Sequence, residues 1–170
     1  MSVLKEGNLQ ITIPNATGFR KFDDGTTHGL THCMKAVDFI VELPDYFLFI
    51  EVKDPENPLA MSEDRTQFVN EFKSGKIDEN LKYKYRDSFL YEWASGRVNT
   101  KPIFYYVLIA IKNLSAADLL IRTEELKRKL PLHGPASGEW KHPIINGCAV
   151  FNIASWNKKL PKYAVQRINP

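Results

Sequence analysis

The sequence feature that most constrains the fold is a pair of apolar runs around a turn, in residues 35–55 (KAVDFIVELPDYFLFIEVKDP). The runs, residues 36–43 and 46–52, are rich in Val, Ile, Phe and Tyr, which favour strands. Pro44 and Asp45 between them are typical turn residues. We therefore expect a tight β-hairpin in this segment.

A two-residue turn determines which residues of the hairpin face each other. If Pro44 and Asp45 form the turn, Asp38 lies directly opposite Glu51. Because side chains alternate between the faces of a strand, Asp38, Glu51 and Lys53 share one face. The other face is almost wholly apolar, and the charged face also carries aromatic and aliphatic side chains. We expect cover on both faces except at the charged end.

Two carboxylates directly opposite each other repel, so this end of the hairpin needs a compensating charge. A cation is the simplest one. Mg2+ binds carboxylate and carbonyl oxygens, which Asp38, Glu51 and the carbonyl of Val52 could supply, and Mn2+ is expected to substitute for it. Lys53 on the same face could hold or deprotonate a water, or neutralise charge on a phosphate.

These residues carry a resemblance to a known family. Asp38, twelve intervening residues and then Glu51-Val52-Lys53 resemble the active-site signature of the PD-(D/E)xK nuclease superfamily. The resemblance spans residues 35–112 and implies a restriction-endonuclease-like fold whose carboxylates bind Mg2+ for phosphodiester hydrolysis. This sequence has Val37 where the family pattern has proline. The resemblance makes Asp38, Glu51 and Lys53 the expected catalytic residues.

Pro44-Asp45 is a second match to the first half of that signature. Asp45, however, lies in the turn, six residues before Glu51. At about 3.4 Å per residue it is roughly 20 Å from the carboxylate that it would have to join. We therefore prefer Asp38.

Length and composition suit one globular domain spanning residues 1–170, with 44% hydrophobic and 25% charged residues. The sequence has no bilayer-length apolar run and no signal-peptide core at its start, so we expect a cytoplasmic protein without a membrane partner. Cys33 and Cys148 are isolated and indicate neither a disulfide framework nor a zinc site.

Charge is distributed unevenly around a net value of +3. Residues 1–80 hold 8 Lys and Arg against 14 Asp and Glu, whereas residues 81–170 hold 15 against 6. This division suits an acidic metal centre that faces a basic surface for a polyanion, and we expect DNA as the partner. Solvated faces without a partner are the plain alternative, and the sequence leaves open a homodimer or a protein partner.

Before the hairpin we expect a short strand at residues 8–13 and a segment that is mostly loop at residues 15–32. Four side chains of this loop are candidates for an additional metal ligand or a neighbour of one: Asp23, Asp24, His28 and His32. Loop aspartates more often cap turns, and an isolated histidine is usually a polar surface group.

After Pro58 we expect a helix with Ser62 as N-cap, interrupted at Gly75, and a second helix that is capped by Asp78 and ends at Gly96. Four residues of the second helix form an expected core stripe: Leu81, Tyr85, Phe89 and Trp93. In the resembling family this helix packs beside the site, which makes Lys84 and Arg86 candidates for nucleic-acid contact. A solvated helix face is the alternative.

Residues 102–111 (PIFYYVLIAI) predict a strand buried on both faces, joined to the hairpin by a helical crossover. Ser115 and Asp118 indicate a capping box at the start of another helix. A loop is expected at 132–146, in which Trp140, Lys141 and His142 could contact a base or a phosphate backbone, or pack over the core. Closing strands are expected at 147–153 and 162–168.

Together these patterns predict an α/β fold with a mixed central β-sheet flanked by helices and a restriction-endonuclease-like core. The expected function is that of a Mg2+-dependent nuclease with DNA as substrate. One alternative is a nucleic-acid- or protein-binding domain that uses this fold without catalysis. The other is a hairpin whose Lys53 neutralises Asp38 or Glu51 as a structural ion pair.

Overall fold

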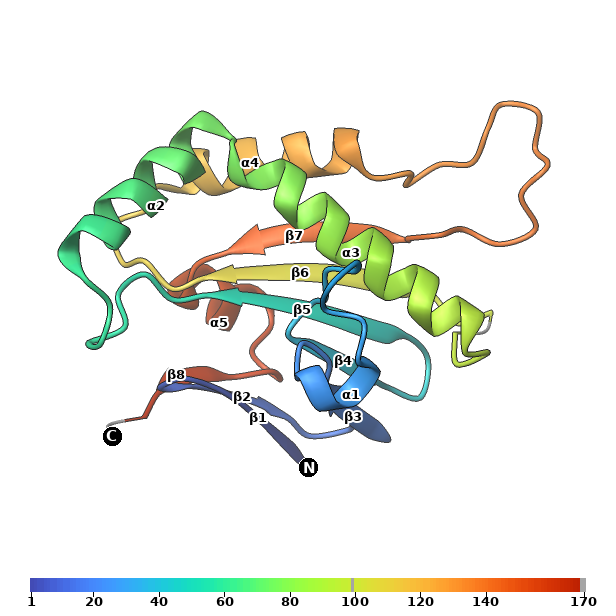
Figure 1. Ribbon diagram of the computed structural model, residues 1–170, viewed down its shortest axis with the longest axis horizontal. Helices are drawn as coiled ribbons and strands as arrows, with labels where there is room; N and C mark the ends of the chain where they lie inside the picture. The colour runs from blue at the N-terminus through green and yellow to red at the C-terminus, as the bar shows by residue number, and fades with distance from the viewer. Residues whose placement is uncertain (99, 169–170) are drawn as a thin grey trace.

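The computed structural model describes residues 1–98 and 100–168, with the side chains of Thr27 and His28 left out, and in this part of the chain it contains two β-sheets (Figure 1). The five-stranded sheet has the order β3 (Gly18–Lys21), β4 (Phe39–Glu42), β5 (Phe47–Lys53), β6 (Ile103–Ile109), β7 (Gly147–Phe151). The three-stranded sheet has the order β1 (Ser2–Glu6), β2 (Leu9–Ile13), β8 (Val165–Arg167). The helices are α1 (Gly25–His28), α2 (Ser62–Ser74), α3 (Ile77–Ala94), α4 (Ala116–Lys129) and α5 (Ile153–Lys159).

The central hairpin has the predicted register. β4 and β5 are antiparallel with Phe39 opposite Ile50, and the amide of Leu43 donates a hydrogen bond to the carbonyl of Tyr46 at 2.9 Å. Continued by one residue, this register puts Asp38 opposite Glu51. Asp45 lies in the turn at the other end of the hairpin from Glu51, as the sequence predicts.

Strands β5, β6 and β7 pair in parallel, whereas β3 pairs with β4 antiparallel. β6 pairs with β5 after a crossover through α2 and α3, and β7 pairs with β6 after a crossover through α4. Antiparallel and parallel pairs therefore occur in one sheet, which confirms the predicted mixed α/β architecture. Glu51 and Lys53 lie at the carboxyl end of β5, the edge of a parallel sheet where ligand sites usually occur.

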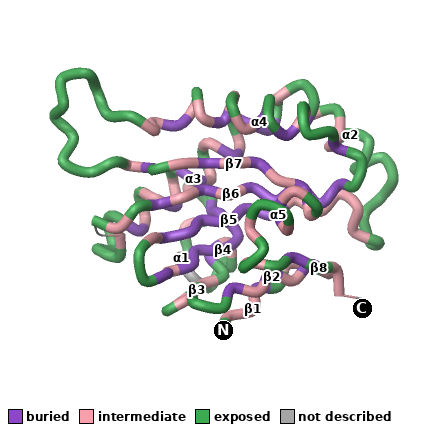
Figure 2. Tube along the Cα trace, turned by 180° about the vertical axis from the view of Figure 1, so that it is seen from behind, coloured by how far each residue is buried: buried purple, intermediate pink, exposed green. Residues whose placement is uncertain are grey.

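Both faces of the sheet are covered, as the hairpin pattern predicts. On one face, side chains such as Ile40, Phe49 and Tyr105 form a core with α2, α3 and α4. On the other face, Val41 and Ile50 pack with the three-stranded sheet and the fully buried Trp156 of α5. Figure 2 shows the buried segments crossing both sheets. The two sheets thus share a core to which both ends of the chain contribute.

One segment expected to be mostly loop contains a strand, and one expected strand is present in the second sheet. The segment expected as a loop at 15–32 contains β3, which pairs with β4 at the edge of the sheet. The expected closing strand at 162–168 is present as β8, but it pairs with β2 in the second sheet. These pairings depend on distant partners, which local residue patterns do not report.

The expected helix ends and the α3 core stripe also needed correction. Helix α2 begins at Ser62 with Met61 as N-cap, and α3 begins at Ile77, so that Asp78 is a buried residue inside the helix. Trp93 is 64% exposed, although Leu81 and Tyr85 are buried. A four-residue spacing drifts by about 40° per step on an α-helix, so the fourth member of the stripe has left the buried face.

Among the described residues, no helix combines the length and the apolar character needed to cross a bilayer.

Candidate metal centre

Asp38 and Glu51 form a buried carboxylate pair at the charged end of the hairpin. Asp38 is 4% exposed and Glu51 is completely buried. Oδ2 of Asp38 accepts a hydrogen bond from the amide of Val52 at 2.5 Å. A strand residue directs its N–H and C=O toward the same neighbouring strand, so the Val52 carbonyl is expected on the Asp38 side as well. The three oxygen donors predicted as metal ligands therefore lie at one end of the hairpin.

Two lysines reach this carboxylate pair. The Nζ atoms of Lys53 and Lys84 each lie 2.6 Å from Oε1 of Glu51. Lys84 also lies 3.8 Å from Oδ1 of Asp38. Lys53 comes from β5 and Lys84 from α3, so the centre combines a strand and a helix. With all four groups ionised, the two positive and two negative charges balance.

Helix α3 is tied to the chain just before β4, and this attachment places Lys84. The hydroxyl of Ser88 accepts a hydrogen bond from the amide of Val37 at 3.0 Å. The carboxylate of Asp87 accepts one from the amide of Lys35 at 2.9 Å. Because Val37 directly precedes Asp38, these contacts fix Lys84 relative to the carboxylates.

The Glu51 carboxylate is the least satisfied group of the centre. Within the described residues, neither Oε1 nor Oε2 receives a hydrogen bond of acceptable geometry, although the two ammonium groups lie close to Oε1. Buried carboxylate oxygens are normally hydrogen-bonded or bound to a metal. Oε2 therefore fits the role of a metal ligand.

Burial and neighbouring charges shift the protonation of the centre. Burial, followed by the charge of Glu51, raises the pKa of Asp38 from 3.8 to about 8. Burial alone would lower the pKa of Lys53, but the charge and contact of Glu51 outweigh it and raise that pKa above 10.5. Lys53 is consequently an ammonium group near neutral pH. It can donate hydrogen bonds to a water or a phosphate oxygen, but it does not act as a base while its pKa stays raised.

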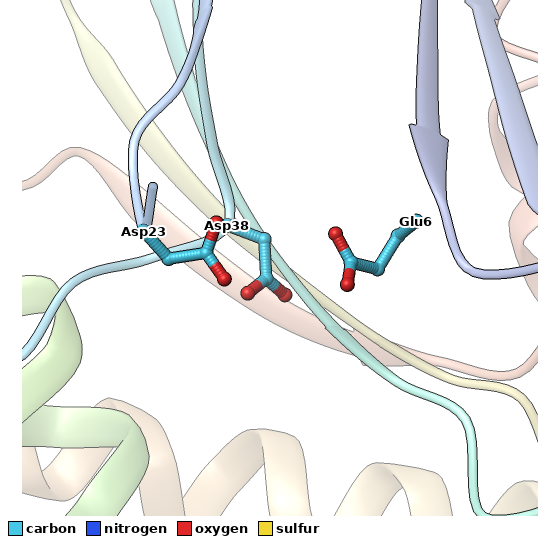
Figure 3. Close-up of side chains that lie close together, drawn as sticks. All are labelled: Glu6, Asp23 and Asp38. Atoms are coloured by element: carbon cyan, nitrogen blue, oxygen red, sulfur yellow. The ribbon is translucent and has the colours of Figure 1, made fainter. Parts of the chain in front are cut away.

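Two further carboxylates approach Asp38 from other elements. Oxygens of Glu6, Asp23 and Asp38 all lie within 4.8 Å of one another, and Figure 3 shows their carboxylates turned toward one another. Lys21 pairs with Glu6 and with Asp23, the latter at 2.9 Å. Asp23 was one of the loop candidates, whereas Glu6 was missed because the three-stranded sheet brings it to the hairpin. No local pattern around Glu6 signals this contact.

In the described part of the chain, Asp24, His32 and Arg86 make no hydrogen bond or ion pair with the carboxylate pair. Asp24 caps α1 by accepting from the amide of Thr26, and His32 is exposed. The side chain of His28 lies outside the described residues. Arg86 is exposed on α3, with its guanidinium carbon 5.5 Å from the Tyr83 ring centroid. Of the two expected nucleic-acid contacts, only Lys84 lies at the carboxylates.

This arrangement has the chemical groups needed to bind a divalent cation and a phosphate together. The carboxylates and the Val52 carbonyl are hard oxygen donors, which Mg2+ and Mn2+ prefer. Two ammonium groups beside them can neutralise an anionic substrate. Comparisons with protein-family models, with curated proteins and with solved structures found no match to this chain.

Proposed function

We propose that this protein is a metal-dependent nuclease that hydrolyses phosphodiester bonds, with DNA as the expected substrate. The observation that carries the proposal is the buried carboxylate pair of Asp38 and Glu51, in which Oε2 of Glu51 lacks a donor within the described residues. A divalent cation held by Asp38, Glu51 and the Val52 carbonyl would supply the missing partner. Glu6 and Asp23 would extend the ligand set on the open side of Asp38.

The order of elements supports a restriction-endonuclease-like core for this site. The family signature requires an aspartate before one strand of a hairpin and Glu-x-Lys on the next, followed by a helix and a buried strand. Here β4, β5, α3 and β6 follow in that order, with α2 inserted before α3. The Asp38 and Glu51 side chains share the face that α3 covers.

The residues of the centre have separable roles in the proposed reaction. When bound, the metal would lower the pKa of a coordinated water and offset charge on the scissile phosphate. Lys53, as an ammonium, donates hydrogen bonds that orient the attacking water. Lys84 offsets the charge of both carboxylates and can contact a phosphate oxygen as a point charge. The basic character of residues 81–170 favours a polyanionic substrate.

The ion pairs of the two lysines support a second candidate, a nucleic-acid-binding domain without catalysis. The ammonium groups of Lys53 and Lys84 already oppose the two carboxylates, so the hairpin end can persist as a structural ion-pair network. Such a protein would bind nucleic acid without requiring a divalent cation. Cleavage under matched metal conditions separates the two functions.

The test is nicking of supercoiled plasmid in Mg2+ and in Mn2+ by the wild type and by Glu51→Gln, Lys53→Met and Lys84→Met. We expect each substitution to lower the rate by about 10²-fold or more, the usual loss for a positioned catalytic group. Lys82→Met is the matched control, because Lys82 pairs with Glu79 on α3 outside the centre. Cleavage that persists in Glu51→Gln would overturn the proposal.

A further inference from the structure

A groove with a volume of about 690 Å3 lies at the C-terminal end of α3, away from the carboxylates. Its walls come from α3, from the start of β6 and from the long segment between α4 and β7, which projects past the sheet in Figure 1. Aromatic side chains at its walls include Phe89, Trp93 and Trp140. The groove therefore joins three segments that are distant in sequence.

Two tryptophans of this groove are exposed. Trp93 is 64% exposed and Trp140 is 40% exposed, whereas Trp156 is completely buried in the core between the sheets. Trp140 packs on the backbone of Gly134, where a Cβ atom would come within 3.3 Å of its side chain. A tryptophan held in place by its own segment, yet open to solvent, presents a rigid aromatic surface to a ligand.

The charge of the groove indicates what kind of aromatic ligand it suits. Lys141 and His142 line it, and none of its described lining residues is an aspartate or glutamate. An aromatic surface beside basic groups without acidic neighbours complements a nucleotide, whose base stacks and whose phosphate is anionic. An apolar protein segment would not need the basic side chains.

We propose that this groove binds an unpaired base of a nucleic-acid strand. The base stacks on Trp93 and Trp140, and Lys141 contacts the adjoining phosphate. This proposal rests on the proposed function, which makes the nucleic-acid strand the substrate. It adds that the substrate has a single-stranded region, in which Trp140 contacts a base and Lys141 contacts the phosphate backbone.

Helix α3 relates the groove to the carboxylates. Trp93 follows Lys84 by nine residues, which corresponds to about 13.5 Å along the helix axis and a turn of roughly 180°. The exposed side of the helix along this stretch carries Tyr83, which precedes Lys84, and Arg86 and Leu90, which follow it. A strand that reaches both sites would cross this face and pass the guanidinium group of Arg86, which stacks near Tyr83.

The experiment compares the affinity of the protein for a short oligothymidylate with its affinity for an abasic strand of the same length and charge. Both titrations are done in EDTA and followed by anisotropy of a terminal label. Stacking of one base predicts an affinity roughly 5- to 150-fold higher for the strand with bases. Trp93→Ala with Trp140→Ala should remove most of this preference, while Trp93→Phe with Trp140→Phe should keep part of it.

Equal affinities for the two strands in the wild type would overturn the inference, as would an unchanged preference in the double alanine variant. The inference would also be overturned if the wild type self-associates with rising concentration, and if the double alanine variant loses this self-association but keeps the strand preference. That result would indicate a protein as the occupant of the groove. Thermal melting checks that the exposed substitutions leave the fold intact.

Repeating the titrations with Glu51→Gln separates this inference from the proposed function. A base preference that survives in Glu51→Gln supports the groove whether or not the wild type cleaves DNA. Absence of plasmid nicking by the wild type, with a base preference present, would contradict the nuclease proposal alone, and wild-type cleavage without any base preference would contradict the groove alone.

Discussion

Asp38 directly precedes β4 and faces Glu51 of β5 when the register of the hairpin is continued by one residue, so the proximity of the two carboxylates follows from that register. Both carboxylates are removed from water, and burial and the charge of Glu51 raise the cost of ionising Asp38. Lys53 and Lys84 offset this cost only in part, since the pKa of Asp38 is still raised to about 8. Protonation of Asp38 is therefore linked to folding.

The metal-free protein should lose stability as the pH rises from about 4 to about 8. In this window the folded protein keeps a proton on Asp38 that the unfolded chain has released, since the unfolded pKa is 3.8. The folded state then binds more protons, so the free energy of unfolding falls with pH. The fall is on the order of 5 kcal/mol, because each unit of pKa difference between the folded and unfolded states corresponds to about 1.4 kcal/mol.

Urea denaturation in EDTA at several pH values measures this dependence. Asp38→Asn should flatten it, because asparagine does not titrate, whereas Asp45→Asn in the exposed turn should leave the slope unchanged. If the free energy of unfolding of Asp38→Asn depends on pH as steeply as that of the wild type, the titrating group is not Asp38.

Sequence patterns were sufficient for the residues of the hairpin and insufficient for those that join it from elsewhere. Turn position and side-chain alternation alone place Asp38 opposite Glu51, because both follow from strand geometry. Lys84 was predicted near a phosphate, but its ion pair with Glu51 depends on how α3 docks. Glu6 had no local signal, because its approach requires the packing of a second sheet.

At the scale of elements, the contact between α3 and α4 depends on a buried ion pair. Nη1 of Arg122 lies 2.7 Å from Oδ2 of Asp78, and both side chains are buried. Gly75, which ends α2 with φ of 79°, lies against this pair, since a Cβ atom there would come 2.0 Å from Nη1 of Arg122. The junction between α2 and α3 therefore requires glycine at this position, because its φ is positive and because a side chain would collide with Arg122.

Arg122→Leu should lower the free energy of unfolding by about 3–5 kcal/mol, because it leaves the Asp78 carboxylate buried without a counter-charge. Arg128→Leu on the same helix is the matched control. Arg128 pairs with Glu125 at the surface and is 73% exposed, so its loss should cost about 0.5 kcal/mol or less.

Urea denaturation of the two variants makes this comparison. Equal losses would show that the Asp78–Arg122 pair does not hold the helices together. The double variant Asp78→Leu with Arg122→Leu should be more stable than Arg122→Leu alone, since no uncompensated charge remains.

Elements with strong local signals were predicted best. The hairpin, the β6 strand and the capping box of Ser115 and Asp118 were all confirmed. The β3 strand was missed because its residues (GFRK) lack a buried apolar pattern and form a strand only by pairing with β4. Asp78 resembled a cap, but its buried partner Arg122 lies 44 positions later in the sequence.

At the scale of the whole molecule, the uneven charge of the sequence corresponds to a spatial division. The acidic first half supplies both carboxylates of the hairpin together with Glu6 and Asp23. The basic second half supplies Lys84, which contacts those carboxylates, and Lys141, which lines the aromatic groove. The proposed nuclease function uses the first group for the metal and the second for the polyanion.

The measurement that tests this account most directly is an isothermal titration of Mn2+ into the wild type, Glu51→Gln, Glu6→Gln and the control Lys82→Met. We expect binding in the wild type and the control, no binding in Glu51→Gln, and weakened binding in Glu6→Gln if its carboxylate joins the ligand set. Wild-type affinity should rise with pH as Asp38 loses its proton. No binding at millimolar Mn2+ in the wild type, or equal binding in Glu51→Gln, would contradict the metal centre and leave a structural ion-pair network.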